Sequence, residues 1–324
     1  MSPMQQELQL NGSILKRFAV LDQRKRLAHA YLFIGPSGIG KTETAVAVAK
    51  LMNCEAGREE FFCDTCSSCI KINAGGHPDV SVIDNGEGES IKIEQIRELL
   101  NRGKLRAFMA RKKVFVIKNI ENLTLESANA FLKTLEEPTA DSLLILTTSI
   151  PETVLDTVKS RCHIVHFPSM SDHDLAGRLR NDHEVNARDS HFFAYFAQGS
   201  LTVAKRLKED RFVEKKNELI DEFVLNRPED ARMKGLLAKK DETKSFLNIL
   251  LSWMRDTLLV KAGVRDNRLI HRDRIDDLDV FVEKYTFEEL KALNESIVKM
   301  CWLLADNLNI KLPLLIIGEQ LWGE

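Results

Sequence analysis

The 324-residue sequence lacks several features that would place it in a simple class of protein. Its 46 basic residues are matched by 48 acidic ones, so the formal net charge is −2, which disfavours a freestanding DNA-binding protein. No apolar run approaches the ~20 residues that a membrane-spanning helix needs. The first residues contain neither a basic segment nor an apolar core, so we expect no secretion signal, a cytoplasmic location and no membrane contact.

Cysteine is also scarce, and four of the six cysteines lie close together in the sequence. Such clustering in a large cytosolic chain favours a metal site over a disulfide framework. The spacing Cys54-x8-Cys63-x2-Cys66-x2-Cys69 allows four thiolates to surround one Zn²⁺ ion. Since all four ligand positions would be filled by sulfur, the zinc would be structural. Reduced cysteines in a loop and a redox disulfide are the alternatives.

Short apolar runs alternate with helical patterns in the first half of the chain. The runs predict buried strands at 30–34, 80–83, 114–117 and 143–146. The patterns between them predict helices at 42–52, 91–102 and 124–136. Buried strands separated by helices are typical of an α/β fold with a parallel sheet.

From about Ser169 onward the pattern is almost entirely that of amphipathic helices. These are predicted at 171–180, 189–198, 200–208, 212–225, 242–261, 276–284 and 287–307. The sequence therefore predicts three parts, which are an α/β domain over 1–167, a small helical segment over 168–208 and a helical domain over 209–324.

A glycine-rich segment lies between the first predicted strand and the helix that follows it. It fits the pattern G-x-x-x-x-G-K-[ST] at every position: Gly35, Pro36, Ser37, Gly38, Ile39, Gly40, Lys41 and Thr42. In such a loop, backbone N–H groups and the helix N-terminus bind phosphate oxygens. We expect Lys41 at the β- and γ-phosphates of ATP and Thr42 at Mg²⁺. A glycine-rich turn with a chance lysine is the alternative.

Hydrolysis requires an acidic residue at the end of a second buried strand, where it holds the metal, and often a glutamate that orients water. The predicted strand 114–117 is followed by Lys118 and Asn119. Lys118 cannot bind a cation, and Asn119 cannot act as a base. Glu121 could reach the metal only if the strand end were displaced. We therefore expect a site that binds nucleotide and hydrolyses it slowly or not at all.

Several further motifs resemble, in order and spacing over 14–167, the clamp-loader AAA+ family of bacteria. They are His29–Phe33 before the loop, the four-cysteine insert, His77-Pro78-Asp79, Ile93-x2-Ile96-Arg97, Ala128–Pro138 and Ser160-Arg161-Cys162. The resemblance implies an AAA+ P-loop domain with a zinc-binding insert, a helical lid over 168–208 and an all-helical collar over 209–324 that joins subunits. The gamma/tau ATPase branch has an acidic strand end and a lid arginine where this chain has Thr202. The chain therefore resembles the branch that lacks these groups.

The resemblance also implies partners and a role in DNA replication. The partners would be gamma/tau ATPase subunits and a delta subunit in a hetero-pentamer of the DNA polymerase III holoenzyme, which loads a sliding clamp onto primer–template DNA. The family's arginine finger, which acts in a neighbouring subunit's ATP site, maps to Arg161. A surface arginine at a strand edge is the alternative for this residue.

Two other functions stay open from the residues alone. One is an autonomous ATPase of the gamma/tau type that uses Lys41, Thr42 and Glu121. The other is a zinc-dependent nucleic-acid-binding module, which the near-neutral charge disfavours. The basic stretch 102–113 fits DNA phosphates, an acidic partner or a solvated surface equally well.

Overall fold

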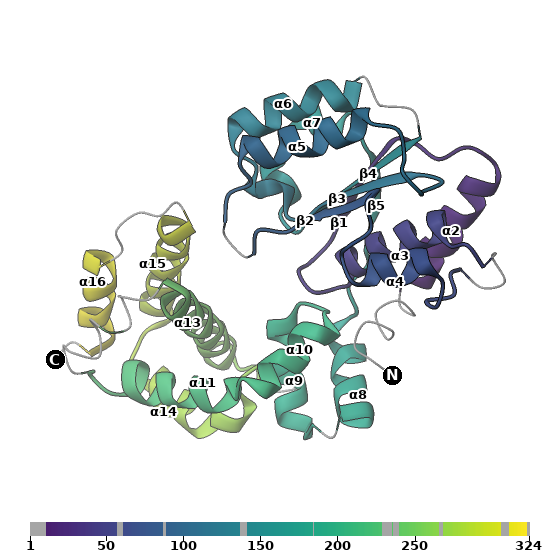
Figure 1. The fold of residues 1–324 in the computed structure, drawn as a ribbon. Coiled ribbons are helices and arrows are strands. Elements are labelled where there is room, and N and C mark those ends of the chain that lie inside the picture. The colour runs from purple at the N-terminus through teal and green to yellow at the C-terminus, as the bar shows by residue number, and fades with distance from the viewer. Residues whose placement is uncertain are drawn as a thin grey trace. The chain divides into compact units, whose positions relative to one another are not determined.

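The computed structural model describes residues 11–56, 61–86, 89–136, 141–183, 185–228, 235, 240–265, 268–305 and 311–322. The chain divides into two compact units (Figure 1). The first comprises Met1–Met170 with Gln198–Thr202, and the second comprises Ser171–Ala197 with Val203–Glu324. The predicted boundaries at 167/168 and 208/209 stay a prediction. None of the helices in the described ranges is both long and apolar enough to cross a membrane.

The first unit contains a five-stranded parallel sheet with the order β2-β3-β4-β1-β5. Its strands are β1 (Ala30–Ile34), β2 (Val80–Ile83), β3 (Lys113–Ile117), β4 (Ser142–Thr148) and β5 (His163–His166). The first four confirm the strands predicted from the sequence. The edge strand β5 was not predicted, because only Val165 among its four residues is buried.

Helices cover both faces of this sheet (Figure 1). One face carries α2 (Gly12–Gln23), α3 (Lys41–Asn53) and α4 (Ser67–Asn73), and the other carries α5 (Ile93–Lys104), α6 (Leu125–Glu136) and α7 (Asp156–Lys159). Successive β1 residues alternate between the two layers, as strand geometry requires. Tyr31 and Phe33 belong to the core beneath α2 and α3, whereas Ala30 and Leu32 belong to the core beneath α5 and α6.

The carboxyl ends of the parallel strands lie along one edge of the sheet, where ligands of α/β proteins bind. The glycine-rich loop follows β1, and Lys118 follows β3. Two short 3₁₀ turns also lie after strand ends: η1 (Ile120–Asn122) after β3, and η2 (Pro151–Thr153) after β4. The fold thus brings every residue expected to contact nucleotide to the same edge.

The second unit is helical among its described residues. Helices lie at each of the positions predicted there: α8 (Asp172–His183), α9 (Ala187–Ala197), α10 (Leu201–Glu209, whose first two residues belong to the first unit), α11 (Phe212–Ile220) with η3 (Asp221–Leu225, a π-helix), α13 (Lys240–Lys261), α14 (Ile275–Glu283) and α15 (Phe287–Ala305). The short η4 (Arg272–Arg274) and the helix α16 (Lys311–Trp322) were not predicted. A continuous apolar core runs through α11, α13, α14, α15 and α16 and includes the fully buried Trp253.

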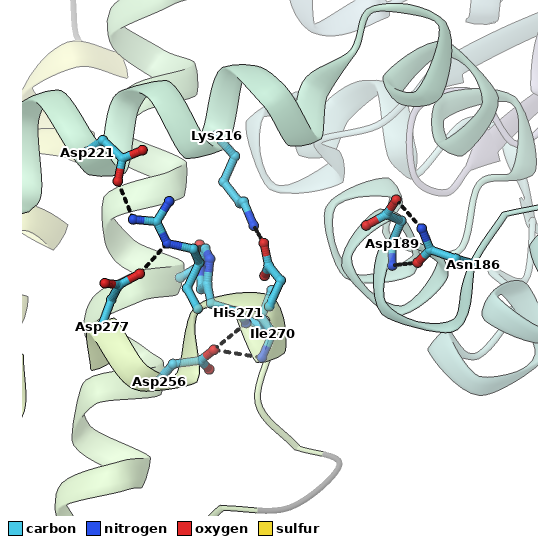
Figure 2. A network of polar contacts seen from close by, with 11 residues as sticks. Asn186, Asp189, Lys216, Asp221, Asp256, Ile270, His271 and Asp277 are labelled. Atoms are coloured by element: carbon cyan, nitrogen blue, oxygen red, sulfur yellow. Dashed lines mark hydrogen bonds and ion pairs between the residues drawn. The ribbon is translucent and has the colours of Figure 1, made fainter. Parts of the chain in front are cut away.

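A polar network is built into this helical unit (Figure 2). The ammonium of Lys216 on α11 is paired with Asp273 and lies 5.0 Å from the ring centre of Phe192 on α9. The buried carboxylate of Asp256 accepts hydrogen bonds of 2.7 Å from the N–H groups of Ile270 and His271. These contacts connect α9, α11 and α13 to the η4 segment, so charged groups help to hold the helices together.

Candidate nucleotide-binding site and cysteine cluster

The backbone of the glycine-rich loop depends on glycine at three positions. Gly38 and Gly40 have φ angles of 68° and 82°, in the left-handed region that favours glycine. At Gly35, an added Cβ would lie 2.5 Å from Cδ1 of Ile39 and 2.8 Å from the carbonyl oxygen of Phe167. The glycines of the motif are therefore required by the loop's own geometry.

Lys41 is 7% exposed and lies inside the loop that it follows. Its ammonium donates hydrogen bonds of 2.6 Å to the carbonyl oxygens of Gly35 and Pro36. Burial lowers the pKa of Lys41 to about 8, against the opposing influence of Glu121 and Glu43. The loop thus holds a buried cation at its centre, where phosphate oxygens could replace the two carbonyl acceptors.

Two residues that the sequence analysis did not assign to the site fasten the loop from outside. The side-chain amide of Asn11 donates a hydrogen bond of 2.9 Å to the carbonyl oxygen of Ile39. The hydroxyl of Ser200 donates one of 2.5 Å to the carbonyl oxygen of Gly38. Ser200 lies two residues before Thr202, the position where the gamma/tau branch has its lid arginine, so a local signal for it exists. Asn11 lies 28 residues from its partner, and no local pattern marks it.

Neither of the two residues that directly follow β3 is acidic. Lys118 forms an ion pair of 2.9 Å with Asp84, which follows the outer strand β2. The N–H group of Asn119 donates to Oγ1 of Thr147 at 3.3 Å. The nearest acidic side chain after β3 is that of Glu121, in η1. The positions where an ATPase needs its acidic pair are therefore occupied by a cation and an amide.

Arg161 lies between α7 and the edge strand β5. Its guanidinium forms an ion pair of 2.6 Å with Glu136 and donates to the carbonyl oxygen of Thr157 at 3.0 Å. The side chains of Arg161 and Glu136 are 35% and 52% exposed, so water competes for this pair. Breaking it costs little, and the guanidinium is free to find another partner. Glu137 and Pro138, the last residues of the motif that begins at Ala128, lie outside the described residues.

The four clustered cysteines come together in space. Their Sγ atoms lie within 4.8 Å of one another, and those of Cys54 and Cys63 are 3.6 Å apart. Tetrahedral Zn–S bonds of ~2.3 Å require sulfur atoms about 3.8 Å apart, so the group fits one zinc ion. Hydrogen bonds from Thr65, and from the N–H group of Cys66, lower the pKa of Cys63 to about 6. Cys63 is thereby favoured as the thiolate that a metal binds.

Polar contacts fix the cysteine insert to helix α3 and to His77. Lys50 on α3 forms an ion pair of 2.6 Å with Asp64, and its ammonium lies 4.1 Å from the ring centre of Phe62. On the other side, the ring of His77 contacts the hydroxyl of Ser68 at 3.2 Å. The insert is therefore held by α3 and by His77, which fits an architectural role.

Asp79, in the His-Pro-Asp motif, fixes the backbone of residues 108–110 within the basic stretch 102–113. Its carboxylate accepts hydrogen bonds from the N–H groups of Phe108, Met109 and Ala110. Lys113 at the end of the stretch is buried and donates to the carbonyl oxygens of Gly103 and Leu105. Part of the stretch 102–113 is thus structural, and it is not a uniform basic surface.

The fold and the loop together define an α/β protein of the P-loop class. Residues 10–171 match the family model described as "DNA polymerase III, delta subunit", and residues 210–318 match "DNA polymerase III, delta subunit, C terminal". The chain belongs to this DNA polymerase III delta-subunit family.

Three relatives show how the similarity is distributed. DNA polymerase III subunit delta' of Bacillus subtilis is 29% identical over 273 residues, which is 82% of each chain. Subunit delta' of Pseudomonas aeruginosa is 38% identical over 143 residues, 44% of each chain. Subunit tau of B. subtilis is 35% identical over 156 residues, 48% of this chain and 27% of tau. Similarity to a delta' subunit thus extends over most of the chain, whereas similarity to tau covers about half of it.

Proposed function

We propose that this chain is the delta'-type subunit of a bacterial clamp loader, which binds ATP but turns it over slowly or not at all. The observation that carries the proposal is the pairing of a complete phosphate loop with a strand end that holds Lys118 and Asn119. The extended similarity to B. subtilis delta' supports the same assignment. The chain would act beside ATPase subunits, which supply the hydrolysis.

The nucleotide occupies the loop at Gly35–Thr42. The residues fit this ligand, because Lys41 is a buried cation whose acceptors are two backbone carbonyls that phosphate can displace. Thr42, at the start of α3, supplies the hydroxyl for Mg²⁺. When bound, Mg²⁺ would neutralise phosphate charge. The chain's own residues hold the ligand in place.

Arg161 acts outside its own subunit, as the arginine finger in the ATP site of a neighbouring gamma/tau subunit. Its exposed position next to the edge strand β5, and its weak pairing with Glu136, suit a group that changes partner on assembly. A finger supplied in trans is worth ~10³–10⁵ in rate in well-studied phosphoryl-transfer systems.

The remaining parts have supporting roles. Cys54, Cys63, Cys66 and Cys69 hold one structural Zn²⁺ ion beside α3. The helical C-terminal region joins the chain to gamma/tau and delta subunits in a hetero-pentamer. The complete ring opens the sliding clamp and places it on primer–template DNA.

Reconstitution with the other clamp-loader subunits, the clamp and primed DNA tests the proposal. We expect Arg161→Ala to lower the ATPase rate of the complex at least about tenfold. Arg180→Ala, which removes an exposed arginine on α8, should leave the rate unchanged. Equal rates for Arg161→Ala and the parent would refute the finger.

A steady-state ATPase measurement on the isolated chain separates this function from an autonomous ATPase. The proposal expects a rate near background for the parent and for Lys41→Met alike. Brisk turnover that Lys41→Met abolishes would assign the chain to the gamma/tau type instead.

A further inference from the structure

Glu121 lies in an unusual place for an acidic residue near a phosphate loop. The backbone turns after β3 at Asn119, which has a φ of 52°, and η1 follows at once. The turn carries Glu121 past the strand end and toward β4, the strand between β3 and the loop-bearing β1.

The carboxylate of Glu121 is held by one oxygen only. Its Oε1 accepts hydrogen bonds from the N–H group and the hydroxyl of Ser149, at 3.3 Å and 3.2 Å. Its Oε2 is buried and has no hydrogen-bond partner among the described residues. A buried, unpaired carboxylate oxygen is costly, and such groups are normally paired with a cation or bound to a metal.

A short chain of contacts connects this carboxylate to the phosphate loop. Ser149 directly follows Thr148, whose carbonyl oxygen accepts a hydrogen bond of 3.4 Å from the N–H group of Gly35. Gly35 in turn accepts from the ammonium of Lys41. The charge of Glu121 is close enough to favour the protonated form of Lys41 against burial. The negative charge of Glu121 is therefore electrostatically coupled to the cation inside the loop.

The other acidic candidate at this edge is already engaged elsewhere. Asp84 forms its ion pair with Lys118, and its carboxylate accepts a hydrogen bond from the N–H group of Gly86. It lies after β2, two strands further from β1 than β4 is. Lys118 itself repels cations. In the described segment 118–124, between β3 and α6, Glu121 is the one acidic residue, and one of its oxygens has no partner.

We propose that Glu121 supplies the carboxylate that binds the Mg²⁺ ion of the nucleotide, in place of the missing acidic pair. The inference rests on the proposed nucleotide binding and adds a cation ligand to it. Ser149 orients the carboxylate, and the free oxygen is the metal ligand. Hydrolysis does not follow, because no second acidic group lies beside it to orient water.

The test compares the affinity of the full-length chain for a fluorescent ATP analogue in Mg²⁺ and in EDTA. The variant Glu121→Gln keeps the size of the side chain and an oxygen for Ser149. Glu126→Gln, on the exposed face of α6, is the matched control. Even outer-shell partners of a metal change its affinity 10- to 100-fold, so we expect the Mg²⁺ enhancement to fall at least about tenfold in Glu121→Gln alone.

A second readout follows the metal directly. With saturating nucleotide, Mn²⁺ binding measured by electron paramagnetic resonance should weaken in Glu121→Gln and recover in part in Glu121→Asp. Unchanged affinity in EDTA shows that the variant is folded. The same Mg²⁺ enhancement in Glu121→Gln as in the parent, or a parent that binds nucleotide without Mg²⁺ enhancement, refutes the role of Glu121 and leaves nucleotide binding intact. A parent that binds no nucleotide refutes both.

Discussion

Replacing Asp273 with asparagine should lower the free energy of unfolding of the C-terminal unit by about 3 kcal/mol. The side chain of Lys216 is only 1% exposed, and its ammonium is paired with the carboxylate of Asp273. Removing one member of a buried ion pair typically costs 3–5 kcal/mol, because the other charge stays buried without compensation. The side chain of Asp273 is 23% exposed, so water can enter near it. We therefore expect a loss of stability at the lower end of this 3–5 kcal/mol range.

The reverse substitution should cost less. Lys216→Met removes the buried charge and leaves a carboxylate that water can reach, so we expect a loss of about 1 kcal/mol. The double variant should be no less stable than Lys216→Met. This order gives a coupling of about 3 kcal/mol between the two positions in a double-mutant cycle.

The three tryptophans of the sequence make the measurement specific. Trp253, Trp302 and Trp322 all belong to the second unit, so their fluorescence in urea reports on that unit without a contribution from the sheet. Trp253 is fully buried, and its ring lies 5.4 Å from that of His271, inside the network. Arg265→Gln, which removes one side of an exposed ion pair, is the control and should cost less than 1 kcal/mol.

The pH dependence provides an independent check. Burial lowers the pKa of Lys216 below its ordinary value of 10.5, while Asp273 opposes this shift. Between the lowered pKa and 10.5, the unfolded chain binds a proton that the folded chain does not, so stability rises with pH. In Asp273→Asn the pKa of Lys216 falls further, so the rise of stability with pH begins at a lower pH than in the parent. Equal costs for the two single variants, or a deficit in Asp273→Asn that grows with pH, would refute the reasoning.

Two other predictions concern the first unit. Nucleotide affinity should fall by up to about tenfold per pH unit above pH 8, because bound phosphate needs the protonated form of Lys41, whose pKa burial lowers to about 8. Fluorescence titration from pH 7 to pH 9.5 measures it, and a flat profile contradicts it. Cys63→Ser should lose the one zinc equivalent of the purified chain, measured by elemental analysis against Cys301→Ser, which should keep it. Equal zinc content in the two variants would contradict the four-cysteine site.

The sheet could be predicted from the sequence where strands are buried on both faces. The β4 segment has seven consecutive buried residues, so its apolar run is unambiguous. The β5 segment is an edge strand with three exposed residues, and its pattern cannot be distinguished from a loop. Helix α16 was missed for a different reason. A proline at position 313 argues against a helix in the sequence, but Pro313 lies in the first turn of α16, where a proline costs no hydrogen bond.

The parts of the candidate site that form short patterns in the sequence could be predicted. The eight loop positions and the four cysteines are local patterns, and the structure brings each set together. Contacts across long sequence separations left no such signal, as between Asn11 and Ile39 or between Glu121 and Ser149. From the sequence alone, Glu121 is expected to reach the metal only if the strand end is displaced. The left-handed turn at Asn119 is a local change of direction after β3 that periodicity does not reveal.

A complete phosphate loop beside a strand end that has lost its acidic pair raises an electrostatic question. Lys118 adds a positive charge near Lys41 and lowers the pKa of Lys41. Asp84 offsets this charge, because its pKa is held below the ordinary value: hydrogen bonding and attraction from Lys118 outweigh the opposing effect of burial. Glu121 adds a negative charge from the other direction. With these two carboxylates in place, Lys41 is still mostly protonated at neutral pH and can bind phosphate. The loop therefore does not depend on the acidic pair that hydrolysis needs in order to keep its cation.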